Sequence, residues 1–413
     1  MRGRLVFAPM RRGVVAVHHA TEPQDPETLE LAFFKGGNLD EAGKADCRAW
    51  CVFSRWEWPV TQVTTSEDVL EVRRVEANDA GLWDAYVLAH PTGTVFHKLA
   101  WSQAVEAAYG HEPLHLLAWH EGRVTGVLPL FLVKSLLVGR VLVSVPYATY
   151  GGILADSHEV AATLLASAQE LCRTFGARYL ELRHREPNDL GLPEVDRYDT
   201  FRKALPEQVE GVMASLPRKT RAAARNGLKR LGEDCAAVGR EWLDTIYDLY
   251  SVTLRRLGSP NYSRRLFHAL LERYGDDCVC LVVRDRGTPV AGVVSFVFGD
   301  EIVPYFSGSL DLGMEKDANN VMYVRLMEHA VGRGLHRFDF NRTRRDNRGP
   351  YDFKRHHGFE PTPLHYQFHM TGGRELPNLT PSNAKYALAG RVWRKLPLWV
   401  TRPAGAQVTK WVP

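Results

Sequence analysis

The chain has 413 residues, of which 45% are hydrophobic and 24% are charged, with a formal net charge of +4 at pH 7. This length accommodates two or three domains, and the composition is typical of a globular protein rather than a disordered or fibrous one. The charge is small for the length, so we expect no DNA partner. The six cysteines include no CxxC pair, and we therefore expect no metal site.

Residues 1–70 mix arginine, proline, glycine and acidic residues without a sustained hydrophobic period. This pattern predicts a weakly ordered N-terminal extension. The first twenty residues lack the continuous apolar stretch of a signal peptide, and no apolar run reaches the ~18 residues that span a bilayer. We therefore expect a cytoplasmic protein.

Regular periodicity begins near residue 71. In chain order it predicts a strand, two helices, three strands, a helix and a final strand. Their ranges are 70–75, 80–89, 101–109, 114–120, 123–133, 138–145, 160–175 and 179–182. Gly176 stands where a C-terminal cap of the 160–175 helix is expected.

The second half repeats the later part of this order. Its predicted elements are strands at 279–284, 290–298 and 302–306, a helix at 320–331 and a strand at 338–340. Gly176 and Gly334 are each followed, after three residues, by an apolar–acidic–apolar triplet. We interpret the repeat as an internal duplication with a period of about 160 residues. The alternative is that this order of elements is simply common in α/β chains.

An antiparallel meander followed by a helix and a returning parallel strand resembles the layout of the GNAT fold. The expected fold class is therefore α/β with mixed sheets, built from tandem GNAT-like domains related by a pseudo-two-fold duplication, with a ligand cleft between them. We divide the chain into an extension (1–70), a first domain (71–205), a second domain that begins with a basic helix (206–372) and a tail (373–413).

The basic helix, predicted at 216–231, carries arginine or lysine at three- and four-residue spacing. Arg221 and Arg225 lie one turn apart and are candidates to clamp a phosphate or carboxylate group, which suits the planar guanidinium. An exposed basic face without a ligand explains the same spacing.

The stretch Gly349-Pro-Tyr351-Asp-Phe353-Lys354, followed by Gly358-Phe359, resembles the FemAB-like aminoacyltransferases. Other stretches that fit, in order along the chain, are Pro146–Gly152, Leu216–Arg225, Thr253–Pro260, Tyr305–Ser309 and Ala318–Asn320. Together they resemble the FemAB-related subgroup associated with exosortase/PEP-CTERM systems and exopolysaccharide loci, which carries a BioF2-like acetyltransferase domain. The resemblance covers roughly residues 70–372.

The sequence departs from that subgroup in two ways. Asn341-Arg342-Thr343 stands where Gly-Arg-Ser is usual. The coiled-coil arm of some Fem proteins, a candidate tRNA contact, has no counterpart, which weakens the case for an aminoacyl-tRNA donor.

The resemblance implies an N-acyltransferase in which Lys354 is catalytic. Attack of an amine on an ester or thioester creates a tetrahedral oxyanion, which a fixed cation stabilises. No Gly-x-Ser-x-Gly or Cys–His signature indicates a covalent nucleophile. Without the motif, Lys354 would be interpreted as a solvated lysine beside a strand.

Further candidates for binding the substrate share a place in, or beside, the matching stretches: Arg221, Arg225, Arg255, Tyr150, Gly151, Tyr305, Asn320, Arg342 and Tyr351. Several have simpler explanations. Arg255 favours a helix C-terminus, Gly151 a plain turn and Asn320 a helix cap, while Tyr305 is equally suited to a core. Arg342 also fits a solvated basic loop.

The leading hypothesis is aminoacyl or peptidyl transfer to an amine acceptor in cell-envelope or exopolysaccharide biosynthesis. The alternatives are acyl-CoA-dependent N-acetylation and a non-catalytic scaffold in polysaccharide assembly. The Arg/Gln-x-x-Gly-x-Gly/Ala turn that usually holds the CoA pyrophosphate is not found before residue 160 or 320, which argues against ordinary acetyl-CoA use.

No bound cofactor is expected, because the anionic acyl donor is itself a substrate, either aminoacyl-tRNA or acyl-CoA. The tail combines tryptophan with basic residues, which is typical of contact with an anionic membrane surface. We consider a peripheral position at the inner membrane, but prefer packing of the tail on the protein body, because Pro397 and Pro403 interrupt a long helix.

Overall fold

The computed structural model describes residues 69–136, 138–372 and 384–412, with the side chains of 384–387 excepted. The predicted extension 1–70 lies outside these residues apart from its last two. Within the described ranges, no helix is both long and apolar enough to cross a bilayer.

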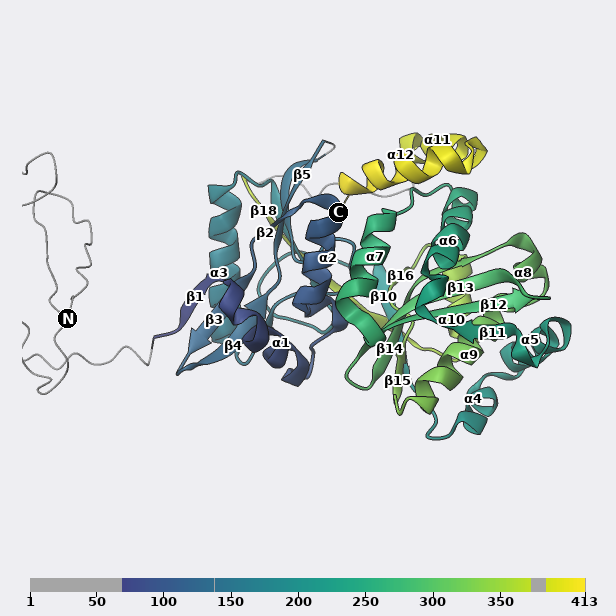
Figure 1. Ribbon diagram of the computed structural model, residues 1–413. Coiled ribbons are helices and arrows are strands. Elements are labelled where there is room, and N and C mark those ends of the chain that lie inside the picture. Colours follow the sequence, from purple (N-terminus) through teal and green to yellow (C-terminus); the bar gives the residue numbers. More distant parts are fainter. Residues whose placement is uncertain (1–68, 137, 373–383, 413) are drawn as a thin grey trace, which may run out of the picture. The chain divides into compact units, whose positions relative to one another are not determined.

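The first half forms two sheets flanked by three helices (Figure 1). The helices are α1 (Ala80–Ala89), α2 (Leu99–Tyr109) and α3 (His158–Thr174). The strands are β1 (Glu71–Arg74), β2 (Glu112–Pro113), β3 (Leu116–His120), β4 (Arg123–Leu128), β5 (Phe131–Ser135), β6 (Gly139–Val143), β7 (Leu154–Ala155), β8 (Tyr179–His184) and β9 (Glu194–Val195). The single strand predicted at 123–133 is wrong: Pro129, which has no N–H for a ladder, separates β4 from β5, and the two strands join different sheets.

The second half is built around one eight-stranded sheet. Its strands are β10 (Tyr198–Ala204), β11 (Ala236–Val238), β12 (Cys278–Asp285), β13 (Thr288–Phe298), β14 (Glu301–Ser309), β15 (Arg337–Asp339), β16 (Thr343–Arg344) and β17 (Pro361–Pro363), and β18 (His365–Met370) follows. The helices are α4 (Val209–Ser215), α5 (Arg218–Leu231), α6 (Leu243–Leu257), α7 (Arg264–Tyr274), α8 (Asp311–Glu315), α9 (Ala318–Gly332), α10 (Arg348–His356), α11 (Ala384–Lys395) and α12 (Leu398–Lys410).

Each half contains one parallel strand pair joined by a long helix. In the first half β6 pairs with β8 across α3, at Leu142–Leu180 and Val143–Glu181. In the second half β14 pairs with β15 across α9, at Glu301–Arg337 and Ile302–Phe338. Both ladders are short, so the strands of each pair part after two residues. This repeated layout confirms the predicted tandem GNAT-like fold class.

Two strands cross between the halves. β10, from the stretch assigned to the first domain, lies antiparallel to β15 in the second sheet. β18, from the stretch assigned to the second domain, lies antiparallel to β8 along its whole length, from His365–His184 to Met370–Tyr179. Each crossing strand supplies partners to main-chain groups that a sheet edge leaves unpaired. The halves are therefore interlocked rather than joined end to end.

Aromatic residues of both halves share one buried core. The Trp101 ring on α2 lies 5.5 Å, centroid to centroid, from Phe296 on β13, and the Phe96 ring lies 5.2 Å from Tyr305 on β14. These ring contacts therefore pack the two halves directly against each other.

Candidate functional site

Lys354 lies in the last turn of α10, against the end of β15. Its Nζ donates to the carbonyl oxygens of Phe340 at 2.6 Å, Asn341 at 2.8 Å and Arg342 at 3.2 Å. An ammonium group has three protons, so each of them has a main-chain acceptor here. Burial lowers the pKa of Lys354 to about 7. Lys354 therefore fixes the chain after β15, where Asn341 adopts a left-handed φ of 60°.

Arg342 follows this turn and lies between two tyrosine rings. Its guanidinium carbon is 4.8 Å from the ring centroid of Tyr198 and 5.6 Å from that of Tyr366, and Nη1 donates to the Tyr366 hydroxyl at 2.8 Å. The Tyr366 hydroxyl in turn donates to Thr149 O, in the other half. Within the part of the chain that the structure describes, no carboxylate forms an ion pair with Arg342. A half-buried guanidinium held by aromatic rings and lacking an acidic partner is suited to an anionic ligand.

Tyr150 reaches from the first half to β15. Its hydroxyl donates to the fully buried Asp339 at 2.9 Å and also contacts the Thr200 hydroxyl. Burial raises the pKa of Tyr150 well above its usual value, and Asp339 adds to the shift, so the phenol keeps its proton and acts as a donor. Nearby, Arg202 bridges Glu301 at 2.8 Å and Asp339 at 3.7 Å.

Gly151 and Gly152 explain how Tyr150 can be placed there. Both donate their N–H to Arg183 O on β8 at 3.0 Å, and Gly151 has a φ of 141°. A Cβ on Gly152 would overlap the His184 ring. The glycines thus let this loop bond to β8 while it passes close to the side chains of Val145 and His184.

Tyr305 and Tyr351 also reach this region. The Tyr305 hydroxyl donates to Tyr147 O at 2.6 Å, from β14 to the first-half loop. Tyr351 on α10 donates to Asp199 on β10 at 2.6 Å. The structure therefore brings together five predicted residues around the end of β15: Tyr150, Tyr305, Arg342, Tyr351 and Lys354.

Gly151 adjoins Tyr150, and the other four predicted residues lie apart. Arg225 on α5 is exposed, and Arg221 donates to Ala214 O at 3.3 Å. Arg255 lies in the last turn of α6, which Gly258 terminates with a φ of 76°. Asn320 lies in the first turn of α9, where its N–H donates to Asp317 O at 3.0 Å. Among the described residues, no hydrogen bond or ring contact joins these four to Lys354 or Arg342.

Three residues of the site were not singled out as candidates from the sequence. Asp339 is the acidic member of an apolar–acidic–apolar triplet, which is the one signal the sequence offered. Arg183 is buried and donates to Val145 O at 2.9 Å and Ala148 O at 3.0 Å, which holds the Tyr150 loop. Tyr366 lies on the exchanged strand β18, and nothing in its sequence context indicates Arg342 as its neighbour.

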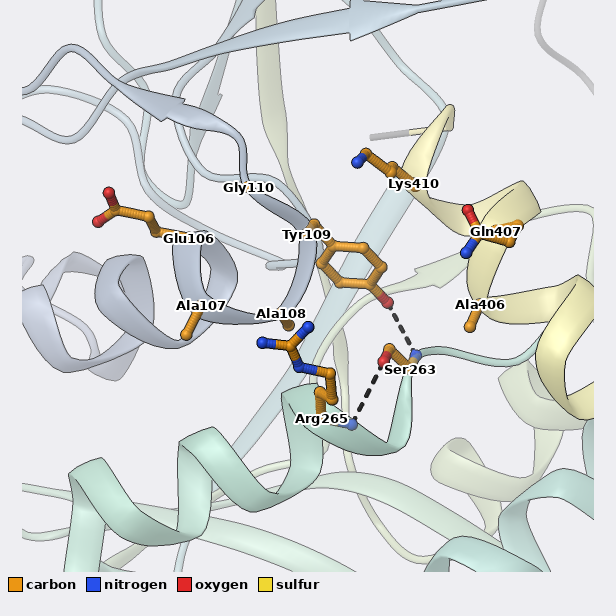
Figure 2. Close-up of a pocket in the computed structure, with 10 residues that line it drawn as sticks. All are labelled: Glu106, Ala107, Ala108, Tyr109, Gly110, Ser263, Arg265, Ala406, Gln407 and Lys410. Carbon is orange, nitrogen blue, oxygen red and sulfur yellow. Dashed lines mark hydrogen bonds between the residues drawn. The ribbon is translucent and has the colours of Figure 1, made fainter.

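Two cavities lie elsewhere. One, of about 320 Å³, lies at the N-terminus of α3 and is lined by His97, His184 and Arg185, among others. The other, of about 400 Å³, lies where α2, α7 and α12 meet; in Figure 2 the Tyr109 hydroxyl in its wall accepts a hydrogen bond from Ser263 N–H. Gly152, in the glycine pair after Tyr150, lines the first cavity, and none of the ten candidate site residues lines either one. Over the described ranges, no three His, Cys, Asp or Glu side chains are grouped as a metal site requires.

Comparison with known proteins supports the fold. Residues 216–355 match the acetyltransferase (GNAT) domain model. A crystal structure of FemX is 15% identical with a TM-score of 0.57, covering 72% of this chain and 97% of that one. No curated protein matches the sequence.

Two further solved structures align more loosely. A domain of a putative lysylphosphatidylglycerol synthetase from Agrobacterium fabrum is 14% identical with a TM-score of 0.48, covering 76% of this chain and 95% of that one. A tandem GNAT protein from the clavulanic acid pathway is 13% identical with a TM-score of 0.47, covering 74% and 100%. The likeness to FemX, at 15% identity, shows a shared fold, and residues 216–355 of this chain match the acetyltransferase (GNAT) domain model.

Proposed function

We propose that the chain is an N-acyltransferase that transfers an acyl group from an activated ester or thioester to an amine. The observation that carries the proposal is Arg342, a half-buried cation without a described acidic partner at the end of β15, inside the stretch that matches the acetyltransferase (GNAT) model. An anionic donor supplies the missing negative charge.

Lys354 is the proposed electrostatic stabiliser of the reaction. Attack of the amine places negative charge on the carbonyl oxygen, and a fixed cation or N–H donor lowers the barrier by roughly 3–4 kcal/mol. The bond from Nζ to Arg342 O, at 3.2 Å, is the longest of its three, so it is the one that an oxyanion would replace. By holding the carbonyls of 340–342, Lys354 also positions Arg342.

For the substrates, we propose an aminoacyl or peptidyl donor and an amine acceptor in cell-envelope or exopolysaccharide biosynthesis, in the cytoplasm near the inner membrane. Aminoacyl-tRNA is the proposed donor on the resemblance to FemAB-like proteins. Acyl-CoA is the second candidate, favoured by the acetyltransferase (GNAT) match itself. Both donors carry phosphate groups, which suit Arg342.

The test is a turnover assay with the purified full chain, offered acetyl-CoA or aminoacyl-tRNA together with a panel of amines. Lys354→Met should abolish turnover while thermal unfolding shows the variant folded. Lys134→Met, at a 64% exposed lysine of the first half, is the matched control and should leave turnover unchanged. Equal turnover by the wild type and Lys354→Met would contradict the role of Lys354. If the wild type bound neither donor, this would contradict the proposed acyltransferase function.

A further inference from the structure

Helix α11 and the start of α12 expose large apolar side chains. Leu388 is 59% exposed, Val392 54% and Trp399 78%. Tryptophan is usually well buried, so the exposure of Trp399, near the start of α12, indicates that another surface covers it. We call Leu388, Arg391, Val392, Lys395 and Trp399 the C-terminal face.

The packing of the two helices determines which side is presented. Gly390 of α11 lies against Gly258 at the end of α6, close enough that a Cβ on Gly258 would be 2.7 Å from Gly390 O. Leu388, Arg391, Val392 and Lys395 follow the spacing of one helical face, and that face is opposite Gly390. Figure 1 shows α11 and α12 running beside α6 at one side of the fold.

The body holds α12 firmly. The Tyr147 hydroxyl donates to Thr409 O at 3.1 Å, and Arg402 pairs with Asp248 at 2.8 Å. Both halves of the fold therefore bond to polar groups of α12. The tail packs on the body, as one of the two sequence interpretations expected, and its outer side remains exposed.

Charge on this segment has a single sign. From residue 385 to the C-terminus the chain contains no Asp or Glu and six basic residues: Lys385, Arg391, Arg394, Lys395, Arg402 and Lys410. Arg391, Arg394 and Lys395 are exposed on α11, and no described carboxylate forms an ion pair with them. A net charge of +4 for the whole chain means that this segment is far more basic than the rest.

We propose that the C-terminal face docks on an anionic lipid surface, with Leu388, Val392 and Trp399 entering the interface and the basic side chains contacting lipid phosphates. Aliphatic and tryptophan side chains interleaved with cations are the combination that an anionic bilayer recognises. Nucleic acid would satisfy the cations and leave Leu388 and Val392 without a partner. This docking proposal does not depend on the proposed acyltransferase function.

The test is co-sedimentation of the full chain with vesicles of phosphatidylcholine alone or of phosphatidylcholine with added phosphatidylglycerol. The wild type should bind the anionic vesicles, and added salt should weaken this binding. Trp399→Ala should weaken binding about tenfold and Lys395→Glu at least about fivefold. Leu388→Gln should also weaken it, while Leu88→Gln, at a 61% exposed leucine on α1, should not.

Three outcomes would overturn the proposal. The first is the absence of binding to anionic vesicles, or binding that Trp399→Ala and Lys395→Glu leave unchanged. The second is binding of tRNA, without vesicle binding, that the same two variants abolish. The third is a wild-type dimer in size-exclusion chromatography that Trp399→Ala converts to a monomer, which would make a second copy of the chain the occupant.

Discussion

Beyond the short ladder of the parallel pair in the first half, the chain that follows β6 stays bonded to β8: Ser144 N donates to Glu181 O at 2.9 Å, and Gly151 and Gly152 both donate to Arg183 O at 3.0 Å. In the second half β14 and β15 part, and the Asn341 side chain, donating to Pro304 O at 2.8 Å, spans the space between them. Tyr150 enters there from the first half. In the first half, the chain that follows β6 thus covers the end of the parallel pair. In the second half, Tyr150 of the first half does so. The candidate site is therefore formed by both halves.

The buried ionisable groups differ as well. Both halves bury neutral histidines: burial lowers the pKa of His97 and His184 to about 3, and that of His115, and of His357 in the second half, to about 4. The second half also holds two lysines with a lowered pKa, about 7 for Lys354 and about 8 for Lys203. Acid should therefore affect both halves, and the lysines should titrate at higher pH than the histidines.

Acid should have the largest effect on stability, and most of it should come from the first half, which buries His97, His115 and His184. The folded-state pKa values of these histidines lie below the unfolded value of 6.5, so the unfolded state takes up protons first and stability falls with pH below 6.5. Lowering the pH from 7 to 5 should cost about 2 kcal/mol for each buried histidine. Urea unfolding across this range measures the loss. His115→Asn keeps an acceptor for Leu130 N–H and should remove one histidine's share, whereas His268→Asn, at a half-exposed site, should not.

The next largest effect on the free energy of unfolding should come from replacing a glycine beside each parallel strand pair with alanine. A Cβ on Gly308 would overlap the main chain of Leu249 and Tyr250 in α6, which cannot move aside, so Gly308→Ala should cost about 3 kcal/mol or more. The nearest atoms to a Cβ on Gly152 belong to the His184 side chain, which borders a cavity, and Gly152→Ala should cost less. Chemical denaturation gives both values. The reverse order would show that the first-half loop is the more rigid of the two.

Tyr150→Phe tests the link between the halves. The substitution removes the donor to buried Asp339 and should cost about 1–3 kcal/mol in the free energy of unfolding. Tyr86→Phe is the matched control, because its hydroxyl donates to the more exposed Asp156, and its cost should be smaller. Equal losses would mean that the Tyr150 contact adds nothing specific to the junction.

The smallest expected effect is kinetic and concerns the buried lysine. If the protonated form of Lys354 is the active one, the acyl-transfer rate should fall as pH rises through about 7. Lys354→Arg keeps the charge at higher pH, so its rate, although lower, should not fall in this range. The pH profiles of kcat/KM for the two proteins decide this. A fall of the same size in both would assign the titration to another group.

Local patterns were sufficient for most elements of the tandem fold. Helix periodicity predicted α1, α3, α5 and α9 closely, and Gly176 and Gly334 marked the ends of α3 and α9, since these signals lie within a few neighbouring residues. The motif around Lys354 led to the end of β15, and five of the predicted site residues meet there.

The exchange of β10 and β18 was not predictable, because a strand's own sequence does not say which sheet edge it completes. For the same reason, no local pattern indicates that Tyr366 bonds to Arg342, or that Arg183 supports the Tyr150 loop. The three carbonyls that bind Lys354 are likewise visible only once the chain turns after β15. The sequence by itself determined the repeated elements and the cationic candidates, since those depend on local spacing. Only the tertiary structure decided which half completes the other, since that depends on contacts between residues up to about two hundred positions apart.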